Sequence, residues 1–283
     1  MNPDHIAQAA QLAMLIELSS DPKPGNVDRG HDYDDIGFHH FLVSAVSAYP
    51  VFRKAASGKG SQGELILDAV SSWRRWHLED NTHFGSLTLL MPLSAAAGKT
   101  GDLREMLCQV LNDTTVEDAV NFYAAFDLAG ARVADVADLS LKDPRSAEKV
   151  RQSGETLLDL MRRSQDHDLV AKEWANGFER SFRLSDVLMD NVDRHGLNDG
   201  VVLTYLETLA EEPDSLVRSK FGREKAEEVS RRAGAAIGRG VEETLRRAEE
   251  LDRAFIEEDV NPGSSADLIA AALFIALVKG MRF

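Results

Sequence analysis

The sequence of 283 residues has one cysteine, Cys108, and few residues that interrupt regular structure. A single thiol excludes an internal disulfide framework and a zinc site built on cysteine ligands. With 8 prolines, 20 glycines and 43% hydrophobic residues, the composition is typical of a folded domain rather than a disordered or collagen-like chain. The longest apolar run, residues 268–278, has 11 residues, well short of the roughly 20 that cross a bilayer.

Positive charge is also scarce. The chain has 32 Lys and Arg residues against 47 Asp and Glu, which gives a formal net charge of −15. This balance argues against a nucleic-acid partner and against docking on an anionic membrane surface. Residues 1–5 do not form the basic segment that precedes the apolar core of a signal peptide. We therefore expect a soluble, cytoplasmic protein.

The apolar pattern is helical. Few segments alternate polar and apolar residues as strands do, whereas apolar residues recur at spacings of three and four along most of the chain. The pattern predicts helices over residues 5–18, 36–56, 62–77, 86–97, 102–111, 115–128, 144–164, 168–182, 185–195, 199–210, 223–257 and 264–281. We expect an all-α fold, a single compact multi-helix bundle over residues 1–283, with polar active-site loops.

Three loops between the predicted helices concentrate polar groups on turn-forming residues: 17–35, 80–85 and 259–267. Loops of this kind on a helical scaffold often carry chemistry. Eight residues of the first loop contain Asp28, His31, Asp32, Asp34 and Asp35. Carboxylates this close repel one another unless a cation shares the site, and oxygen ligands without thiolates favour a hard ion such as Mg²⁺.

Each loop also has an ordinary structural interpretation. Asp34 or Asp35 is suited to cap the helix that follows, and residues 81–83 to cap the helix near residue 84. Asp267 would lie in a first helical turn, where a carboxylate is favourable. Asp214, near Arg218 and Lys220, is by itself typical of a surface charge cluster. No Walker A, Gly-x-Gly-x-x-Gly, His-Glu-x-x-His or Gly-x-Ser-x-Gly motif is present.

Four short motifs occur in a fixed order. They are Pro-Lys-Pro-Gly-Asn-Val-Asp at 22–28, with Glu17 before it and His-Asp-Tyr-Asp at 31–34 after it; Asn-Thr-His-x-Gly at 81–85; Asp-x-x-x-Arg at 214–218; and Pro-Gly-x-x-Ala-Asp-Leu at 262–268. Together they resemble the triphosphoribosyl-dephospho-CoA synthase family over nearly the whole chain. Phe84 stands where bacterial members typically have lysine and Asn26 where they have leucine, so the chain is most similar to an archaeal-type, divergent branch.

The resemblance implies an all-helical transferase that joins ATP to 3′-dephospho-CoA and releases adenine. The product supplies the prosthetic group of the acyl carrier subunits of citrate lyase and malonate decarboxylase. In this reaction a ribose hydroxyl attacks C1′ of the ATP ribose through an oxocarbenium-like state, which is related to glycoside cleavage. A base for the hydroxyl proton, a donor for adenine and Mg²⁺ on the triphosphate are expected.

The resemblance also implies residue roles. Four residues are expected to be catalytic: Glu17 facing the oxocarbenium, Asp32 and Asp34 as bases or Mg²⁺ ligands, and His83. Eight are expected to bind or orient substrate: Lys23, Asn26, Asp28, His31, Asn81, Thr82, Arg218 and Asp267. Lys23 and Arg218 would hold phosphate groups, and Asp267 a ribose hydroxyl or the metal shell.

Two other functions remain open. One is a related Mg²⁺-dependent enzyme acting on another nucleotide or sugar-phosphate acceptor, or with water. The other is a non-catalytic helical protein that binds a nucleotide. Residues 233–237 and 268–278 are suited to pack inside the chain or against a second subunit, so a homodimer is also an expectation.

Overall fold

Helices form all the regular structure in residues 1–33, 36–76, 78, 81–130 and 146–283, which this computed structural model describes. They are, in chain order, α1 (Pro3–Ser19), α2 (Phe38–Ala56), α3 (Gln62–Arg74), α4 (Phe84–Ala97), α5 (Leu103–Asn112), α6 (Val116–Ala129), α7 (Ser146–Ser153), α8 (Leu157–Ser164), α9 (Leu169–Asn176), α10 (Glu179–His195), α11 (Leu197–Glu211), α12 (Ser215–Phe221), α13 (Arg223–Ala236), α14 (Val241–Glu257) and α15 (Gly263–Lys279). The prediction of an all-α fold is confirmed.

Polar side chains explain where many helices begin. Asp102, Thr115, Asp168 and Asp214 each accept a hydrogen bond from a backbone N–H in the first turn of the helix that follows. These donors have no partner within their own helix, so a side-chain acceptor stabilises the helix start.

Two predicted helices are each divided in the structure. Residues 223–257 form α13 and α14, which are separated by a segment that contains Gly238 and Gly240. In the described part of 144–164, Gly154 at φ +70° and the cap Thr156 separate α7 from α8. Glycine has little preference for the helical conformation, so apolar periodicity on both sides does not keep the chain helical there.

Two further helix boundaries also differ from the prediction. Gly177 and Phe178 both have left-handed backbone angles, φ 72° and 61°, and they separate α9 from α10. Helix α10 then continues through residues 183–184, where the sequence predicts a gap. The sequence does not predict α12, because its seven residues are too few to show a helical period.

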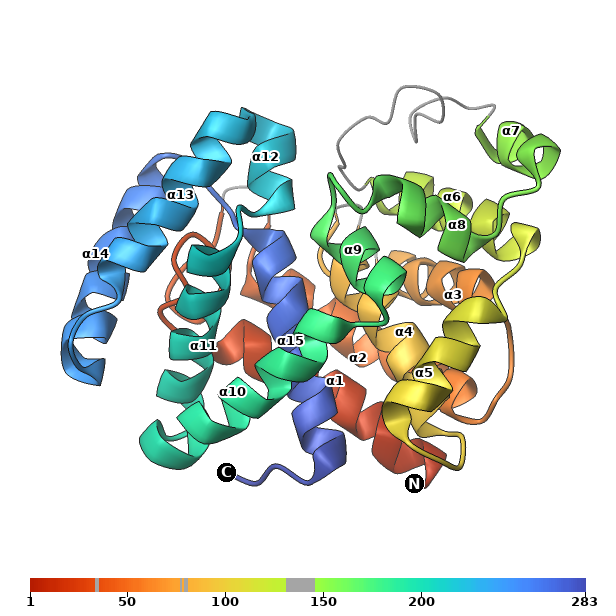
Figure 1. Cartoon of the computed structure of the whole chain (residues 1–283), viewed down its shortest axis with the longest axis horizontal. Coiled ribbons are helices and arrows are strands. Elements are labelled where there is room, and N and C mark those ends of the chain that lie inside the picture. The colour runs from red at the N-terminus through yellow and green to blue at the C-terminus, as the bar shows by residue number, and fades with distance from the viewer. Residues whose placement is uncertain (34–35, 77, 79–80, 131–145) are drawn as a thin grey trace.

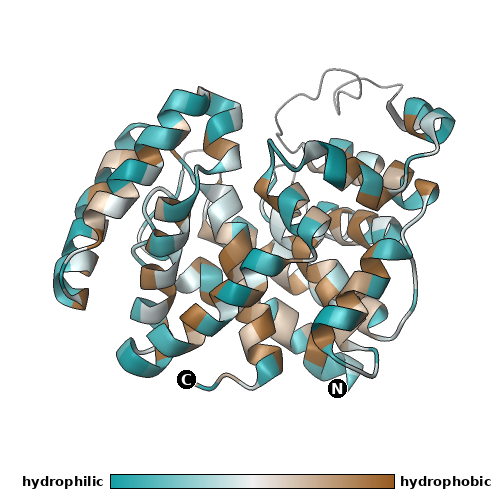
Figure 2. Cartoon of the chain, viewed as in Figure 1, coloured by the Kyte–Doolittle hydropathy of each residue, from teal (hydrophilic) through white to brown (hydrophobic). Residues whose placement is uncertain are grey.

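Helix α15 lies in the middle of the molecule, with α10, α11, α13 and α14 on one side and α2 to α6 with α8 on the other (Figure 1). Figure 2 shows hydrophobic residues along much of α15, whereas α13 and α14 carry many hydrophilic ones. One hydrophobic cluster extends from Ile6 to Met281 and includes residues of every helix. The apolar segment 268–278 therefore packs within the chain, and the homodimer stays a prediction.

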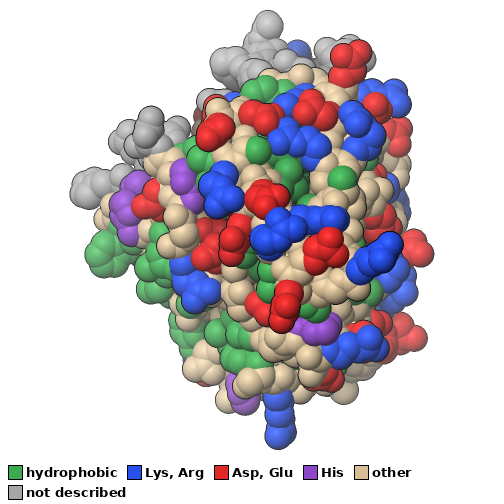
Figure 3. All heavy atoms as spheres, turned by 90° about the vertical axis from the view of Figure 1, so that its left-hand side faces the viewer, with side chains coloured by type: hydrophobic (Ala, Val, Ile, Leu, Met, Phe, Trp, Pro, Cys, Tyr) green, Lys and Arg blue, Asp and Glu red, His purple; other side chains and the backbone are tan. Residues whose placement is uncertain are grey.

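Charged side chains of both signs are mixed over the face that α13 and α14 form (Figure 3). Lys225 and Arg232 both pair with Glu258, and Arg247 pairs with Glu243. Within the described part of the chain, no helix combines the length and the hydrophobicity of a bilayer-spanning segment.

The loop after α1 packs against the connection between α14 and α15. Gly25 has φ +79°, and a Cβ there would lie 2.1 Å from the carbonyl oxygen of Val260. Its backbone N–H donates to Asp252 Oδ1 at 2.8 Å, and its carbonyl accepts from the Tyr33 hydroxyl at 2.7 Å. The first motif is therefore held against the loop that carries the fourth motif.

Candidate functional site

A cavity of about 220 Å³ lies where the loops and the first turns of several helices meet. Its polar lining includes Glu17, Asn26, His83, Ser86, Asp168 and Asp267. Its apolar lining includes Phe41, Phe84, Phe122, Phe126, Met161 and Val170. Asn81 and Thr82 also lie on its wall. The cavity lining therefore combines polar groups, largely from the motifs, with apolar side chains that come largely from α6, α8 and α9.

Glu17 and Lys23 form a buried ion pair at the edge of this cavity. The Lys23 ammonium lies 3.2 Å from Glu17 Oε1 and donates to the Val27 carbonyl at 3.3 Å. Burial raises the pKa of Glu17, and the adjacent Lys23 opposes that rise. Glu17 lines the cavity, whereas Lys23 is fully buried beneath it. Lys23 thus supports a cavity carboxylate.

Asp267 sits against the first turn of α4. The Ser86 hydroxyl donates to its Oδ1 at 2.6 Å, and a Cβ on Gly85 would lie 2.0 Å from its Oδ2. Only glycine at position 85 allows α4 and α15 to approach this closely. Burial raises the pKa of Asp267 to about 8, and the charges of Glu17 and Asp214 act in the same direction.

His83 precedes the first turn of α4 and is 2% exposed. Its Nδ1 lies 2.5 Å from the Ser44 hydroxyl, and the ring makes an edge contact with Phe41 at 4.8 Å between centroids. Burial lowers the pKa of His83 to about 3, and the charge of Lys23 acts in the same direction. The imidazole is therefore neutral at physiological pH.

Asp214 joins the third motif to the fourth. It is fully buried; its Oδ1 accepts from the N–H groups of Leu216 and Val217, and its Oδ2 accepts from the N–H and hydroxyl of Ser265. Burial raises its pKa. The interpretation of Asp214 as part of a surface charge cluster is wrong, because these four contacts fix the starts of α12 and α15 relative to each other.

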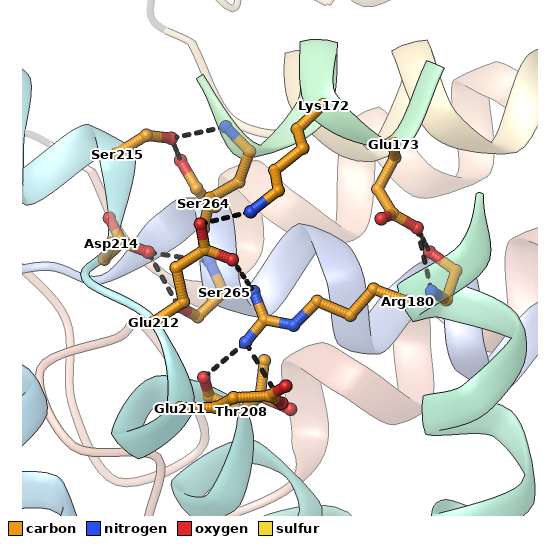
Figure 4. A network of polar contacts seen from close by, with 12 residues as sticks. Lys172, Glu173, Arg180, Thr208, Glu211, Glu212, Asp214, Ser215, Ser264 and Ser265 are labelled. Atoms are coloured by element: carbon orange, nitrogen blue, oxygen red, sulfur yellow. Dashed lines mark hydrogen bonds and ion pairs between the residues drawn. The ribbon is translucent and has the colours of Figure 1, made fainter. Parts of the chain in front are cut away.

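Figure 4 shows the polar network that surrounds this junction. Ser215 donates to Ser264 at 2.8 Å. Nearby, Glu212 accepts from Lys172 at 2.6 Å and from Arg180 at 3.2 Å, so α9 and α10 are tied to the end of α11. The starts of α12 and α15 therefore rest on a network that extends over five helices.

Arg218 does not line the cavity. It donates to the carbonyl of Asp166 at 3.0 Å and lies 3.2 Å from Nδ1 of His167. Its described contacts hold the loop between α8 and α9, and that loop carries Asp168 to the cavity wall. The phosphate contact expected of Arg218 stays a prediction.

The remaining residues of the first motif have mainly supporting contacts. Asn26 lines the cavity and donates to the Tyr205 hydroxyl at 2.5 Å. Asp28 is buried and accepts from the N–H groups of Lys23 and Gly30 at 3.1 and 2.8 Å. The N–H of Asp28 donates to the carbonyl of His31 at 3.2 Å. Asp28 thus stabilises the turn that presents Asn26.

Asp32 lies outside the cavity lining. Its Oδ1 accepts from the N–H of Phe38 at 2.5 Å, so its described contact is with the start of α2. Asp34, its predicted partner in binding Mg²⁺, lies outside the described residues. Nowhere in the described ranges do three or more His, Cys, Asp or Glu side chains form a metal-binding group. The catalytic and metal roles of both aspartates stay predictions.

The cavity contains helix starts but no lysine or arginine among its described lining residues. First-turn residues of α4, α9 and α15 lie on its wall: Phe84 to Ser86, Val170 with Ala171, and Gly263, Ser264 and Ala266. The N-terminal end of a helix carries partial positive charge and exposes N–H donors. Such ends suit an anionic ligand.

Three residues of the site are not identified by the sequence. Asp168 lines the cavity and caps α9 through the N–H of Ala171. Ser86 holds Asp267, and Ser44 contacts His83 from α2. Asp168 marks a helix start in the sequence, but Ser44 and Ser86 lie in ordinary helical segments that carry no local signal of function.

The sequence is similar to those of one protein family over nearly its whole length. Residues 3–282 match the family described as ATP:dephospho-CoA triphosphoribosyl transferase. A probable 2-(5''-triphosphoribosyl)-3'-dephosphocoenzyme-A synthase of Pseudomonas paraeruginosa is 26% identical over 288 residues, which cover 95% of this chain and 89% of that one. The protein of the same name from Pseudomonas savastanoi pv. phaseolicola is 27% identical over 291 residues, 96% of this chain and 90% of that one.

A solved structure is also similar. The crystal structure of a protein from Archaeoglobus fulgidus, described as a triphosphoribosyl-dephospho-CoA synthase, superposes with a TM-score of 0.71 at 30% sequence identity. The match covers 85% of this chain and all of that one. Both the sequence and the fold therefore have counterparts under the same functional name.

Proposed function

The chain belongs to the ATP:dephospho-CoA triphosphoribosyl transferase family, and from this premise we propose that its cavity performs the reaction for which the family is named. The triphosphoribosyl group of ATP is transferred to 3′-dephospho-CoA, and adenine is released. The observation that carries the proposal is the meeting of separate motifs: Glu17, His83 and Asp267, which are 250 positions apart at the extremes, line one cavity.

Two carboxyl groups in different environments supply the acid–base chemistry. Asp267 has a pKa of about 8, so it keeps its proton near neutral pH and gives it to adenine as the C1′–N9 bond breaks. Burial raises the pKa of Glu17, but Lys23, 3.2 Å away, opposes that rise and favours the charged form. As a carboxylate, Glu17 stabilises the positive charge that develops at C1′ and takes the proton of the attacking ribose hydroxyl.

Different parts of the cavity lining suit different parts of the nucleotide. The triphosphate lies at the first turns of α4 and α15, whose N–H groups and dipoles favour negative charge. The purine lies against the phenylalanine rings, where Phe84 contacts the rings of Phe122 and Phe126 at 5.4 and 5.6 Å between centroids. Aromatic rings of this kind stack on a base.

The donor set suits Mg²⁺. The side chains of Glu17, Asn26 and Ser264 offer oxygen atoms, which are the ligands that this hard ion prefers, and no thiol lies on the described cavity wall. Asn26 and Ser264 would hold the ion together with phosphate oxygens, and Glu17 faces C1′. When bound, Mg²⁺ neutralises triphosphate charge that no lysine or arginine of the described lining balances.

Mass spectrometry of the purified protein with ATP, Mg²⁺ and dephospho-CoA tests the proposal. We expect free adenine and the coupled triphosphoribosyl product in equal amounts, and neither without the acceptor. The Glu17→Gln variant should lose both products, whereas Glu250→Gln, on the surface of α14, should retain them. Release of adenine without the coupled product would contradict the assignment of dephospho-CoA as the acceptor. If no adenine is released, the proposed reaction itself is contradicted.

The same proposal places the enzyme in the cytoplasm, where ATP is supplied. A homodimer in solution stays a prediction that light scattering checks, since a single monomeric species at working concentration would contradict it.

The alternatives of a different acceptor and of a non-catalytic binding protein are not favoured, because the family match covers nearly the whole chain.

A further inference from the structure

Ser44 lies outside all four sequence motifs, in the second turn of α2, the helix that contributes Phe41 to the cavity wall. Its side chain is buried, at 1% exposure, and its hydroxyl oxygen lies 2.5 Å from Nδ1 of His83. This contact joins α2 to the residue that precedes α4, across 39 positions of the chain.

The second ring nitrogen of His83 lacks a protein partner. His83 Nε2 is buried and has no hydrogen-bond partner among the described residues, although His83 lines the cavity. A buried polar nitrogen without a partner is unfavourable, so it is expected to be satisfied by a bound molecule or by water. The orphan nitrogen therefore points to a ligand atom in the cavity.

The proton of the Ser44 hydroxyl determines whether Nε2 donates or accepts. A hydroxyl has one proton, and that of Ser44 has two acceptors within reach, Nδ1 of His83 at 2.5 Å and the carbonyl of Phe41 at 3.1 Å. Nδ1 is the nearer of the two acceptors, and the carbonyl of Phe41 is already a main-chain acceptor within α2. The geometry therefore favours donation by Ser44 to Nδ1.

The rest of the surroundings fit this arrangement. With Nδ1 as the acceptor, the single proton of the neutral ring is on Nε2. Burial lowers the pKa of His83 to about 3, so the ring stays neutral and does not gain a second proton at physiological pH. The edge contact with Phe41 restricts rotation of the ring. Nε2–H is thus a fixed, uncharged donor.

We propose that Ser44 is a positioning residue that holds His83 in the tautomer whose Nε2–H donates a hydrogen bond into the cavity, to an unprotonated ring nitrogen of the departing purine. This inference rests on the proposed function for the identity of the acceptor. The bond between C1′ and N9 breaks, its electron pair moves to the purine, and the proton that the purine gains comes from Asp267. His83 keeps its own proton and stabilises the electron density that accumulates on the base.

Nuclear magnetic resonance tests the tautomer without substrate. In protein labelled with ¹⁵N, we expect the shifts of His83 to show a protonated Nε2 and an unprotonated Nδ1. Ser44→Ala should lose this preference, and Ser44→Thr should keep it because threonine retains the hydroxyl. Ser94→Ala is the matched control. Ser94 is a buried serine of α4 whose hydroxyl has no hydrogen-bond partner among the described residues, so its removal should leave the shifts of His83 unchanged.

Kinetics test the consequence. Ser44→Ala should lower kcat at least about tenfold with a smaller change in KM, as expected for an interaction that strengthens in the transition state. Ser44→Thr should restore much of kcat. A wild-type ring with its proton on Nδ1, or a Ser44→Ala variant with the kcat of Ser94→Ala, would overturn the inference. The spectra need no substrate, so the two proposals can fail separately. If the protein is inactive but shows the expected tautomer, the proposed reaction is contradicted and the role of Ser44 in orienting the ring is still supported.

Discussion

Two carboxyl groups of this cavity are expected to differ in protonation because their neighbours differ. Glu17 has a buried cation 3.2 Å away, whereas Asp267 has a hydroxyl donor and two further carboxylates near it. Burial raises the pKa of both groups, but the cation beside Glu17 opposes that rise, whereas the charges of Glu17 and Asp214 add to the rise at Asp267. This contrast underlies the assignment of Glu17 as the carboxylate and Asp267 as the acid.

Replacing Asp267 with asparagine tests the acid. Asparagine keeps an acceptor for the Ser86 hydroxyl but has no proton to give, so adenine release should fall about 10²–10⁴-fold, the usual contribution of a general acid. Initial rates of adenine formation check this. Asp186→Asn makes the same change in an exposed residue of α10 and should have little effect. A rate within a factor of a few of wild type for Asp267→Asn would rule out the acid role.

Asp267 also predicts how stability depends on pH. Its pKa is raised from 3.8 to about 8 in the folded protein. Between these values the folded state binds more protons than the unfolded state, so the free energy of unfolding falls as pH rises. One such group contributes a slope of at most about 1.4 kcal/mol per pH unit.

Thermal and urea unfolding of the ligand-free protein between pH 6.5 and 8 check this slope. The pKa of His83 is lowered in the folded protein, so its titration makes stability rise with pH. This effect is confined to pH values below about 6.5, the pKa of histidine in the unfolded state. Stability of the wild type should therefore decrease across this window more steeply than that of Asp267→Asn. Parallel curves for the two proteins would show that Asp267 does not titrate as inferred.

At the scale of helices, one glycine sets the approach of α4 to α15. A Cβ on Gly85 would lie 2.0 Å from Asp267 Oδ2 and 2.6 Å from its Cγ. Gly85→Ala should destabilise the fold by about 1–3 kcal/mol, as overpacking usually does. Gly234→Ala in α13 is the control, because its Cβ would meet only the Ala210 Cβ at 3.7 Å and alanine favours the helix.

A double-mutant cycle identifies the cause of the Gly85→Ala effect. If the clash is with the Asp267 carboxylate, adding Asp267→Ala should recover more than about 0.5 kcal/mol of the lost stability in urea unfolding. Strict additivity of the two changes would mean that Gly85 is required for another reason.

The same elements show what the sequence can and cannot predict. Apolar periodicity locates most helices, but it does not locate the breaks at Gly154 and Gly177, where left-handed backbone interrupts a continuing pattern. Motif resemblance identifies Glu17, His83 and Asp267, which the fold brings to one cavity. The buried position of Asp214 and the contact of Ser44 with His83 depend on packing between distant helices. No spacing along the chain encodes such contacts.

At the scale of the whole molecule, the acidic chain has to bind an acidic substrate. The net charge is −15, and the described cavity wall has no lysine or arginine. We therefore expect local neutralisation to depend on Mg²⁺ and on the helix ends. Chelation with EDTA should reduce coupled-product formation to background, excess Mg²⁺ should restore it, and the melting temperature should change little. Full activity in EDTA would contradict the metal requirement.

The arrangement of the bound nucleotide is the central claim, and a crystal structure tests it most directly. The protein would be crystallised with Mg²⁺ and a carbocyclic ATP analogue, which cannot form an oxocarbenium ion. We predict that the carbon equivalent to C1′ lies between Glu17 and Asp267, with the purine against Phe84 and within hydrogen-bond distance of His83 Nε2. A nucleotide bound elsewhere, for example beside Arg218 and His167 with the cavity vacant, would contradict the account.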